Sequence, residues 1–267
     1  MTFLSPDARS PLSALDHHRR IIWALLLREL ATRYGRENLG FLWVLGEPLL
    51  FCGSVSIMWS IIKPHYEHGI QIVPFVVTGY MPILLVRHIL SHGMYAARVN
   101  APLLYHRQIT VLHLFFARCL LELIGVTLAF ILITAMLLPF NLIYLPRQLH
   151  LVYIGWFLLA WIWFGLAMIF GSIFEMFEPI ERFVSVITYI LVPLSGTFYM
   201  AAWIPARFRH YVLLLPFLNA VEMVRGGFFG PGVPTYYNIP YTIAWAAGLT
   251  ILGLMMTTFV RNRVFVD

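Results

Sequence analysis

Long apolar stretches separated by short polar ones are the dominant pattern in this chain. A helix crosses the hydrocarbon core of a bilayer, about 30 Å thick, with about 20 apolar residues. On that measure the chain holds six candidate spans, which are residues 39–62, 70–90, 111–138, 149–170, 183–199 and 239–260. The pattern predicts an all-α integral membrane protein with six transmembrane helices in one domain, residues 1–267.

The composition supports lipid as the solvent. Hydrophobic residues make up 60% of the chain and charged residues only 11%, whereas soluble domains carry about 25% charged residues. The net charge of +6 would suggest nucleic acid in a soluble protein, but here the arginines gather at the ends of apolar runs, where lipid headgroups lie. We therefore expect no nucleic-acid partner. Cys52 and Cys119 both lie inside apolar runs, so neither a disulfide framework nor a cysteine metal cluster is expected.

The basic residues also predict an orientation. With the N-terminus in the cytoplasm, the inner segments hold Arg9, Arg19, Arg20, Arg28, Arg33, Arg36, Arg98, Arg107, Arg182, Arg261 and Arg263. The outer segments hold Lys63, Arg147, Arg207, Arg209 and Arg225. Eleven basic residues inside against five outside satisfy the positive-inside rule. Six spans then place both termini in the cytoplasm.

Two inner segments have helical character outside the spans. Residues 16–37 predict a basic amphipathic helix along the inner leaflet. One helical face of it carries Ile22, Trp23, Leu26, Leu27, Leu30 and Tyr34. Ile21 and Leu25 miss that face, and Arg19 and Arg33 intrude on it. Residues 94–109 mix polar and apolar positions and can form helix on either side of Pro102.

The outer segment between the last two spans, residues 201–238, is too apolar for a free loop and too interrupted by proline and glycine for a spanning helix. Non-helical backbone at membrane depth must be enclosed by protein or line a wet cavity. We therefore predict short re-entrant or surface helices there.

Ionisable residues inside the predicted spans are costly unless they pair or line a water-filled path. Arg118 and Glu122 lie one helical turn apart and can neutralise each other. Arg87 is close enough to the inner interface for its side chain to reach the headgroups. Glu47 precedes Pro48 inside the first span, and both an arginine partner and a lumen-facing role remain open for it.

Two possible ligand motifs were weighed and set aside. His88 and His92 have the i, i+4 spacing of a metal pair, but the ligands that would complete such a site are absent and the pair lies where the second span leaves the membrane, so we interpret them as headgroup-level histidines and expect no metal. Lys63 is the only lysine and precedes a proline, so no G-x-x-x-x-G-K-[ST] phosphate loop is present. This chain is therefore expected to bind no cofactor, and any ATP and Mg²⁺ to bind a separate subunit.

Aromatic residues are dense at 16% of the chain. Many are expected in the interfacial belts or in lipid-facing packing. As a set they also suit a sugar pathway, because aromatic rings stack on the apolar faces of pyranoses without fixing them at one point.

The stretch RELATRYGRENLGFLWVLGEPLL, residues 28–50, with the 94–109 segment and the broken outer segment, resembles the ABC-2 exporter permeases. The R-Y-x-x-x-x-L-G-x-x-W core, formed by Arg33, Tyr34, Leu39, Gly40 and Trp43, is similar to that of the glycan-exporting branch. With Glu47-Pro48 it most resembles the Kps-type inner-membrane permease of capsular polysaccharide exporters.

This resemblance implies a permease subunit that moves lipid-linked capsular polysaccharide from cytoplasm to periplasm through the bacterial inner membrane. It implies a homodimer with two cytoplasmic ABC ATPase subunits, a periplasmic polysaccharide co-polymerase and an outer-membrane channel. Residues 16–37 would form a cytoplasmic gate helix, residues 94–109 the segment that couples to the ATPase, and residues 201–238 the periplasmic helices.

The resemblance and the residue types together assign four groups of candidate residues. ATPase coupling is assigned to Arg98, Asn100, Leu103, Tyr105 and Arg107. The gate helix and lipid-anchor contact is assigned to Arg28, Arg33, Tyr34 and Arg36. The translocation path is assigned to Glu47, Trp43, Trp59, Tyr80, Tyr189, Phe198 and Tyr199. The periplasmic exit is assigned to Arg207, Arg209, Glu222 and Arg225, for which headgroup or salt-bridge roles remain open.

Three other classes compete with this interpretation. An ABC-2 permease for O-antigen, teichoic acid or another lipid or amphiphile would share the fold. A membrane-embedded transferase needs clustered acids or histidines in loops, and the inner loops offer only Glu175, Glu178 and Glu181. An ion-coupled secondary transporter favours inverted repeats, and the sequence shows none. We therefore expect a transporter subunit rather than an enzyme.

Overall fold

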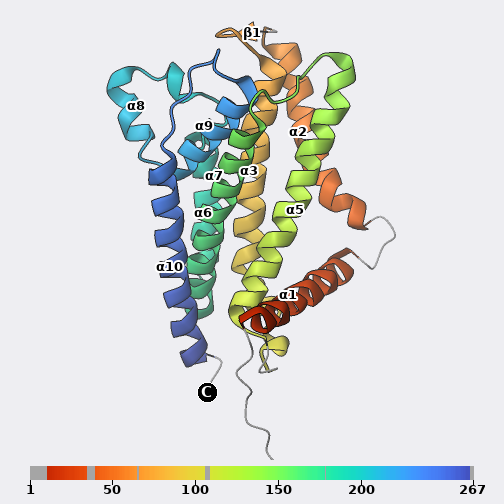
Figure 1. Cartoon of the computed structure of the whole chain (residues 1–267), viewed down its shortest axis with the longest axis vertical. Coiled ribbons are helices and arrows are strands. Elements are labelled where there is room, and N and C mark those ends of the chain that lie inside the picture. The colour runs from red at the N-terminus through yellow and green to blue at the C-terminus, as the bar shows by residue number, and fades with distance from the viewer. Residues whose placement is uncertain (1–10, 35–39, 65, 106–108, 178, 265–267) are drawn as a thin grey trace, which may run out of the picture.

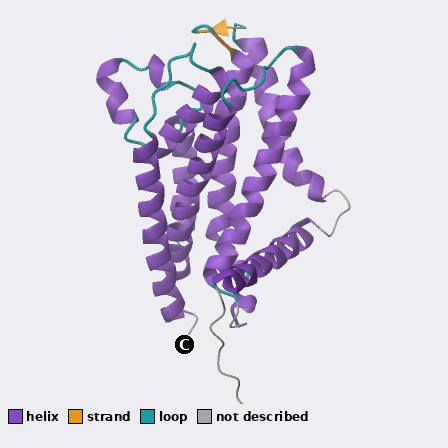
Figure 2. Ribbon diagram, viewed as in Figure 1, coloured by secondary structure: helices purple, strands orange, loops and turns teal. Residues whose placement is uncertain are grey.

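The computed structural model describes residues 11–34, 40–64, 66–105, 109–177 and 179–264, and it is almost entirely helical (Figure 2). In the first half of the chain the elements are α1 (Pro11–Tyr34), α2 (Gly40–Ile62), β1 (Tyr66–Glu67), β2 (Ile70–Gln71), α3 (Ile72–Met94), α4 (Ala96–Val99), η1 (Ala101–Tyr105), α5 (Val111–Leu137) and η2 (Leu138–Phe140). In the second half they are α6 (Leu149–Met176), α7 (Ile180–Leu194), η3 (Ala201–Trp203), α8 (Ala206–Val212), α9 (Pro216–Phe229) and α10 (Ile239–Val264).

Five of the described helices are long and apolar enough to cross a membrane, or six if the bent pair α8–α9 is taken as one span. Helices α2, α3, α5, α6 and α10 confirm the apolar helices predicted at 39–62, 70–90, 111–138, 149–170 and 239–260. The predicted span 183–199 is different, because α7 has 15 residues and ends at Leu194. At 1.5 Å per residue it is about 22 Å long, short of a full hydrocarbon core.

The predicted outer segment, residues 201–238, contains three short helices. They are η3, α8 and α9, and α8 and α9 meet at 111°. Nearly all of α9 is buried, and it packs against α6. Protein therefore encloses α9, whereas α8 has no buried residue and lies at the surface.

Helix α3 forms the centre of the bundle. It is buried along almost its whole length and packs against α2, α5, α6 and α9. Helix α6 packs in turn against α9 and α10. Two hydrogen bonds join α6 to its neighbours. Trp156 Nε1 donates to Thr127 Oγ1 of α5 at 2.8 Å, and Trp161 Nε1 donates to Thr250 Oγ1 of α10 at 2.9 Å. Such bonds and close packing hold membrane helices together, since lipid is as apolar as their side chains.

The two ends of the bundle differ (Figure 1). The α1 end carries α1, which lies across the bundle, together with α4, η1 and the C-terminal end of α10. The hairpin end carries the β1–β2 hairpin and α8. In the hairpin Tyr66 pairs with Gln71 and Glu67 with Ile70, and the two-residue turn has positive φ at His68 and Gly69, as a tight hairpin of this twist requires.

The face of α1 that packs against the protein is not the apolar face predicted to lie on the inner leaflet. Leu25 and Leu26 are buried and Ile21 packs against the same cluster, whereas Trp23 and Leu27 are largely exposed. Glu29 is also buried. Helix α1 therefore packs against α5 through a face that mixes apolar side chains with the Glu29 carboxylate. Part of its apolar surface stays exposed.

Candidate functional site

The predicted coupling segment folds as α4 followed by η1, at the α1 end. Arg98 is exposed, and its guanidinium lies 5.1 Å from the ring centroid of Phe174. Leu103 packs against the cluster that contains Leu25 of α1. The side chain of Tyr105 and the whole of Arg107 lie outside the described residues. Arg98 alone among the described coupling residues therefore presents a charged group at the surface.

Asn100 connects this segment to α1. It is buried, and its Nδ2 donates to the Ala96 carbonyl at 2.9 Å. Its Oδ1 accepts a hydrogen bond of 2.9 Å from Arg28 Nη1. A predicted gate residue and a predicted coupling residue are therefore in direct contact. The side chains of Arg33 and Tyr34, and Arg36 as a whole, lie outside the described residues.

A second connection joins α1 to α5. Arg118 forms an ion pair with Glu29, and both side chains are nearly buried, with 10% and 11% exposed. His18 Nδ1 lies 2.8 Å from His113 Nε2 in a further α1–α5 contact. The predicted partner of Arg118 was Glu122 on the same helix, whereas the pair that forms is interhelical, with Glu29.

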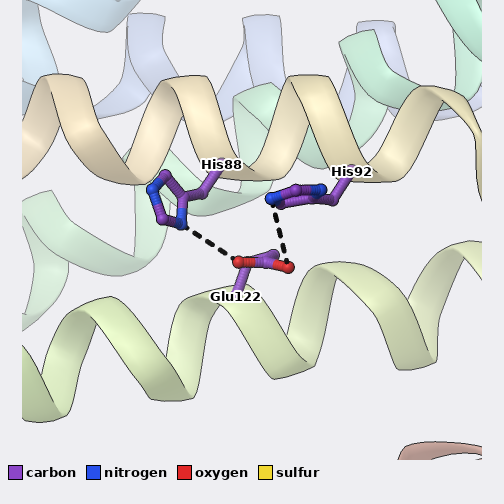
Figure 3. Close-up of side chains that lie close together, drawn as sticks. All are labelled: His88, His92 and Glu122. Carbon is purple, nitrogen blue, oxygen red and sulfur yellow. Dashed lines mark hydrogen bonds and ion pairs between the residues drawn. The ribbon is translucent and has the colours of Figure 1, made fainter. Parts of the chain in front are cut away.

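Glu122 meets the two histidines of α3 (Figure 3). His88 Nδ1 lies 3.1 Å from Glu122 Oε2, and His92 Nε2 lies 3.9 Å from Glu122 Oε1. On the other side of the same ring, His88 Nε2 lies 3.7 Å from Glu47 Oε1 of α2. Helices α2, α3 and α5 thus contribute to one ionisable cluster, which we define as Glu47, His88, His92 and Glu122.

Three of the predicted path residues come together toward the hairpin end. The rings of Trp59 and Phe198 are stacked with centroids 6.2 Å apart, and Tyr80 meets Phe198 edge-on at 5.9 Å. Phe51, which the sequence analysis did not select, joins them at 5.8 Å from Tyr80. Phe51 and Phe198 are each about 40% exposed. We define these four residues as the aromatic cluster.

The other predicted path residues make other contacts or lie outside the described residues. Tyr189 on α7 is 71% exposed. Tyr199 is half-buried, and its hydroxyl donates to the Leu194 carbonyl at 3.2 Å. The side chain of Trp43 lies outside the described residues. Glu47 belongs to the ionisable cluster instead, so α2 contributes residues to both clusters.

Two of the four predicted exit residues do not present charge to a polymer. Arg225 is fully buried, and its guanidinium donates to the carbonyls of Tyr199 at 2.5 Å and Thr197 at 3.2 Å. Glu222 is also fully buried and accepts from the backbone N–H groups of Ala201 and Tyr236. Both residues organise the backbone between α7 and α10, so neither offers a surface charge, and the structural role left open for them is the one that their contacts favour.

Arg209 and Arg207 complete the predicted exit group. Arg209 donates to the Ala201, Ala202 and Ile204 carbonyls and lies over the Tyr236 ring at 4.2 Å. It therefore ties η3 to the start of α8. Arg207 is exposed, with Phe208 as its aromatic contact at 5.9 Å, and it is the described member of the group that still offers a surface charge.

Comparisons with known proteins place the chain in a family. No protein-family model matches it. It is 38% identical over 243 residues to the capsule polysaccharide export inner-membrane protein CtrC of Neisseria meningitidis, covering 91% of this chain and 92% of the relative. It is 36% identical over 237 residues to the capsule polysaccharide export inner-membrane protein BexB of Haemophilus influenzae, covering 89% of each.

The chain belongs to the family of capsule polysaccharide export inner-membrane proteins. The polysialic acid transport protein KpsM of Escherichia coli is a more distant relative, 25% identical over 236 residues, covering 86% of this chain and 91% of KpsM. The resemblance to the Kps-type permeases is thereby confirmed. These relatives are named as export and transport proteins, which favours a transport subunit over the transferase interpretation.

Sequence reasoning missed two features of this family member. Glu29 lies on a helix that was interpreted as facing lipid, and the i, i+4 spacing of Arg118 and Glu122 pointed to a partner within the same helix instead. The His88–His92 spacing was recognised but dismissed, because Glu122 is distant in sequence and comes close only when α3 packs against α5. The i, i+4 histidines were the available signal.

Proposed function

We propose that this chain is the membrane permease subunit of an ATP-driven exporter that moves lipid-linked capsular polysaccharide from the cytoplasm to the periplasm. The observation that carries the proposal is the near full-length similarity to CtrC and BexB, which are named as capsule export inner-membrane proteins. The membrane-spanning helices agree with it. O-antigen and other amphiphiles are the alternative cargo. Permeases for that cargo would share the fold, but they do not share this level of sequence similarity.

Energy comes from a partner in this proposal. The sequence has no phosphate-binding loop, so two copies of this chain would carry two cytoplasmic ABC ATPase subunits that bind ATP and Mg²⁺. The contact point on this chain is the α4–η1 segment, with Arg98 on its surface. The Arg28–Asn100 hydrogen bond would transmit a displacement of the α4–η1 segment directly to α1.

The proposed topology places the α1 end in the cytoplasm, consistent with the positive-inside rule. Helix α6 ends near the α1 end and α10 begins near the hairpin end (Figure 1), so the chain crosses between them. Helix α7 makes that crossing together with the residues that follow it, and α8 and α9 form a re-entrant segment on the periplasmic side. Both ends of the chain then face the cytoplasm, where α1 meets the inner leaflet.

The cargo is proposed to pass along the exposed side of α2, at an interface between two copies of the chain. The aromatic cluster provides ring faces there, and Lys63 lies 5.5 Å from the Trp59 ring centroid at the outer end of α2. Arg207 adds an exposed positive charge on the same side of the membrane. A periplasmic co-polymerase and an outer-membrane channel would receive the polymer.

The test is to purify the tagged chain from its native membrane in mild detergent, identify what accompanies it, and measure capsule on the surface of a strain that lacks the chain. We expect an ABC ATPase in equal amount and restoration of surface capsule by the intact gene. A chain that purifies without any nucleotide-binding subunit after crosslinking would overturn the exporter. If the strain that lacks the chain kept normal surface capsule and lost O-antigen, the proposed capsular cargo would be wrong.

A further inference from the structure

The ionisable cluster contains the ligand set of a metal site. One nitrogen from each of His88 and His92 and one oxygen from Glu122 all lie within 4.8 Å of one another. Ligand atoms of a tetrahedral zinc ion lie about 3.3 Å apart, given bonds of about 2.0–2.2 Å. The contacts of 3.1 Å and 3.9 Å to the two oxygens of Glu122 bracket that value. Because the three ligand atoms lie within 4.8 Å of one another, side-chain rotations that shorten the longest of these separations would bring them onto one ion.

Glu47 has the position of a supporting carboxylate. His88 directs Nδ1 at Glu122 and Nε2 at Glu47, so one ring faces a carboxylate on each side. Metal-binding histidines commonly direct their second nitrogen at a carboxylate, which fixes the tautomer and the ring orientation. Glu47 would therefore act on the ion through His88, because the ring separates it from the ligand atoms.

Charge and access also suit a divalent cation. Metal binding requires both imidazoles to be neutral, and the two carboxylates then leave a net charge of −2, which one such ion neutralises in a region where unbalanced charge is costly. Glu122 is only 2% exposed, whereas His92 is 31% exposed and Glu47 is 58% exposed. His92 lies two residues before the end of α3, so an ion can enter from the α1 end.

We propose that His88, His92 and Glu122 bind a divalent transition-metal ion of the zinc class, with Glu47 orienting the ring of His88. Two imidazoles favour this class over Mg²⁺ and Ca²⁺, which prefer oxygen ligands. The ion would clamp α3 to α5 and hold α2 through Glu47. It would thus brace the helices that carry both clusters, independently of whether the cargo is a capsular polysaccharide.

The test uses the full chain, purified without a polyhistidine tag, stripped with a chelator and titrated with Zn²⁺ against a chromophoric competitor. We expect one tight site per chain. His88→Asn and Glu122→Gln should each weaken binding at least 100-fold, and Glu47→Gln about 10-fold, as for other supporting carboxylates. His150→Asn, which removes an exposed histidine of α6, should leave the affinity unchanged.

X-ray absorption of the Zn²⁺-loaded protein should show a mixed nitrogen and oxygen shell. If buried variants fail to fold, His92→Asn provides the same test at a partly exposed position. Zn²⁺ affinity that is equal in wild type and in the His92→Asn or Glu122→Gln variant would overturn the site. Tighter binding of Mg²⁺ than of Zn²⁺ would overturn the metal class. None of these measurements depends on export.

Discussion

Breaking the Glu29–Arg118 ion pair should release α1 from the bundle. The apolar side chains of α1 lose little when they exchange protein for lipid, because lipid is equally apolar. The position of α1 therefore depends mainly on its polar contacts with α5 and α4. Glu29→Gln leaves Arg118 charged and nearly buried without its carboxylate. Removing one partner of a buried pair costs about 3–5 kcal/mol.

The lower end of that range applies here, because the two side chains retain about 10% exposure. A loss of about 3 kcal/mol changes the docking equilibrium about 150-fold, at 1.4 kcal/mol per factor of ten. The assay is the rate of tryptic cleavage within α1 of the protein in lipid nanodiscs, since cleavage follows the undocked population when redocking is fast. Neither Glu29→Gln nor Arg118→Met removes a cleavage site within α1.

The matched control is Asp16→Asn, which breaks the exposed pairs of Asp16 with Arg19 and Arg20 and should change the rate less than about threefold. Glu29→Gln and Arg118→Met should each speed cleavage about 100-fold. The double variant, Glu29→Gln with Arg118→Met, should be cleaved more slowly than the two single effects on the rate would predict if they were additive. The reason is that no lone buried charge remains. Additive effects, or a Glu29→Gln rate equal to that of Asp16→Asn, would refute the reasoning.

Three further predictions address coupling, packing and the path. Arg28→Ala should reduce capsule export several-fold while ATP hydrolysis persists, because it removes the bond to Asn100; Asp16→Asn should leave export intact, and a parallel loss of hydrolysis would contradict a coupling role. Gly79→Ala should destabilise the protein by about 2 kcal/mol in thermal unfolding, because its Cβ would lie 2.7 Å from the Thr197 carbonyl oxygen. Gly248→Ala meets nothing within 4 Å and should be neutral or slightly stabilising, so equal effects would argue against this packing. Trp59→Ala and Phe198→Ala should each lower surface capsule with normal protein levels, whereas Phe157→Ala, an exposed aromatic on α6, should not; export that survives both cluster substitutions would remove the aromatic cluster from the path.

The sequence by itself was sufficient for the features that depend on local periodicity and composition. The apolar runs at 39–62, 111–138 and 239–260 became helices of nearly those bounds, since a bilayer sets the length of a spanning helix. The 28–50 stretch was sufficient to indicate the family. Residues 94–109 were compatible with helix on either side of Pro102, and the structure has α4 before that proline and the 3-10 helix η1 across it.

Tertiary structure decided which ionisable groups meet. Arg118 and Glu122 are one turn apart on α5, yet each finds a partner on another helix, Glu29 for Arg118 and His88 for Glu122. The burial of Arg225 and the face that α1 turns to α5 have the same origin. Periodicity along one helix identifies neighbours within that helix. The relative rotation and depth of two packed helices depend on side-chain packing over the whole interface, and only the folded chain determines them.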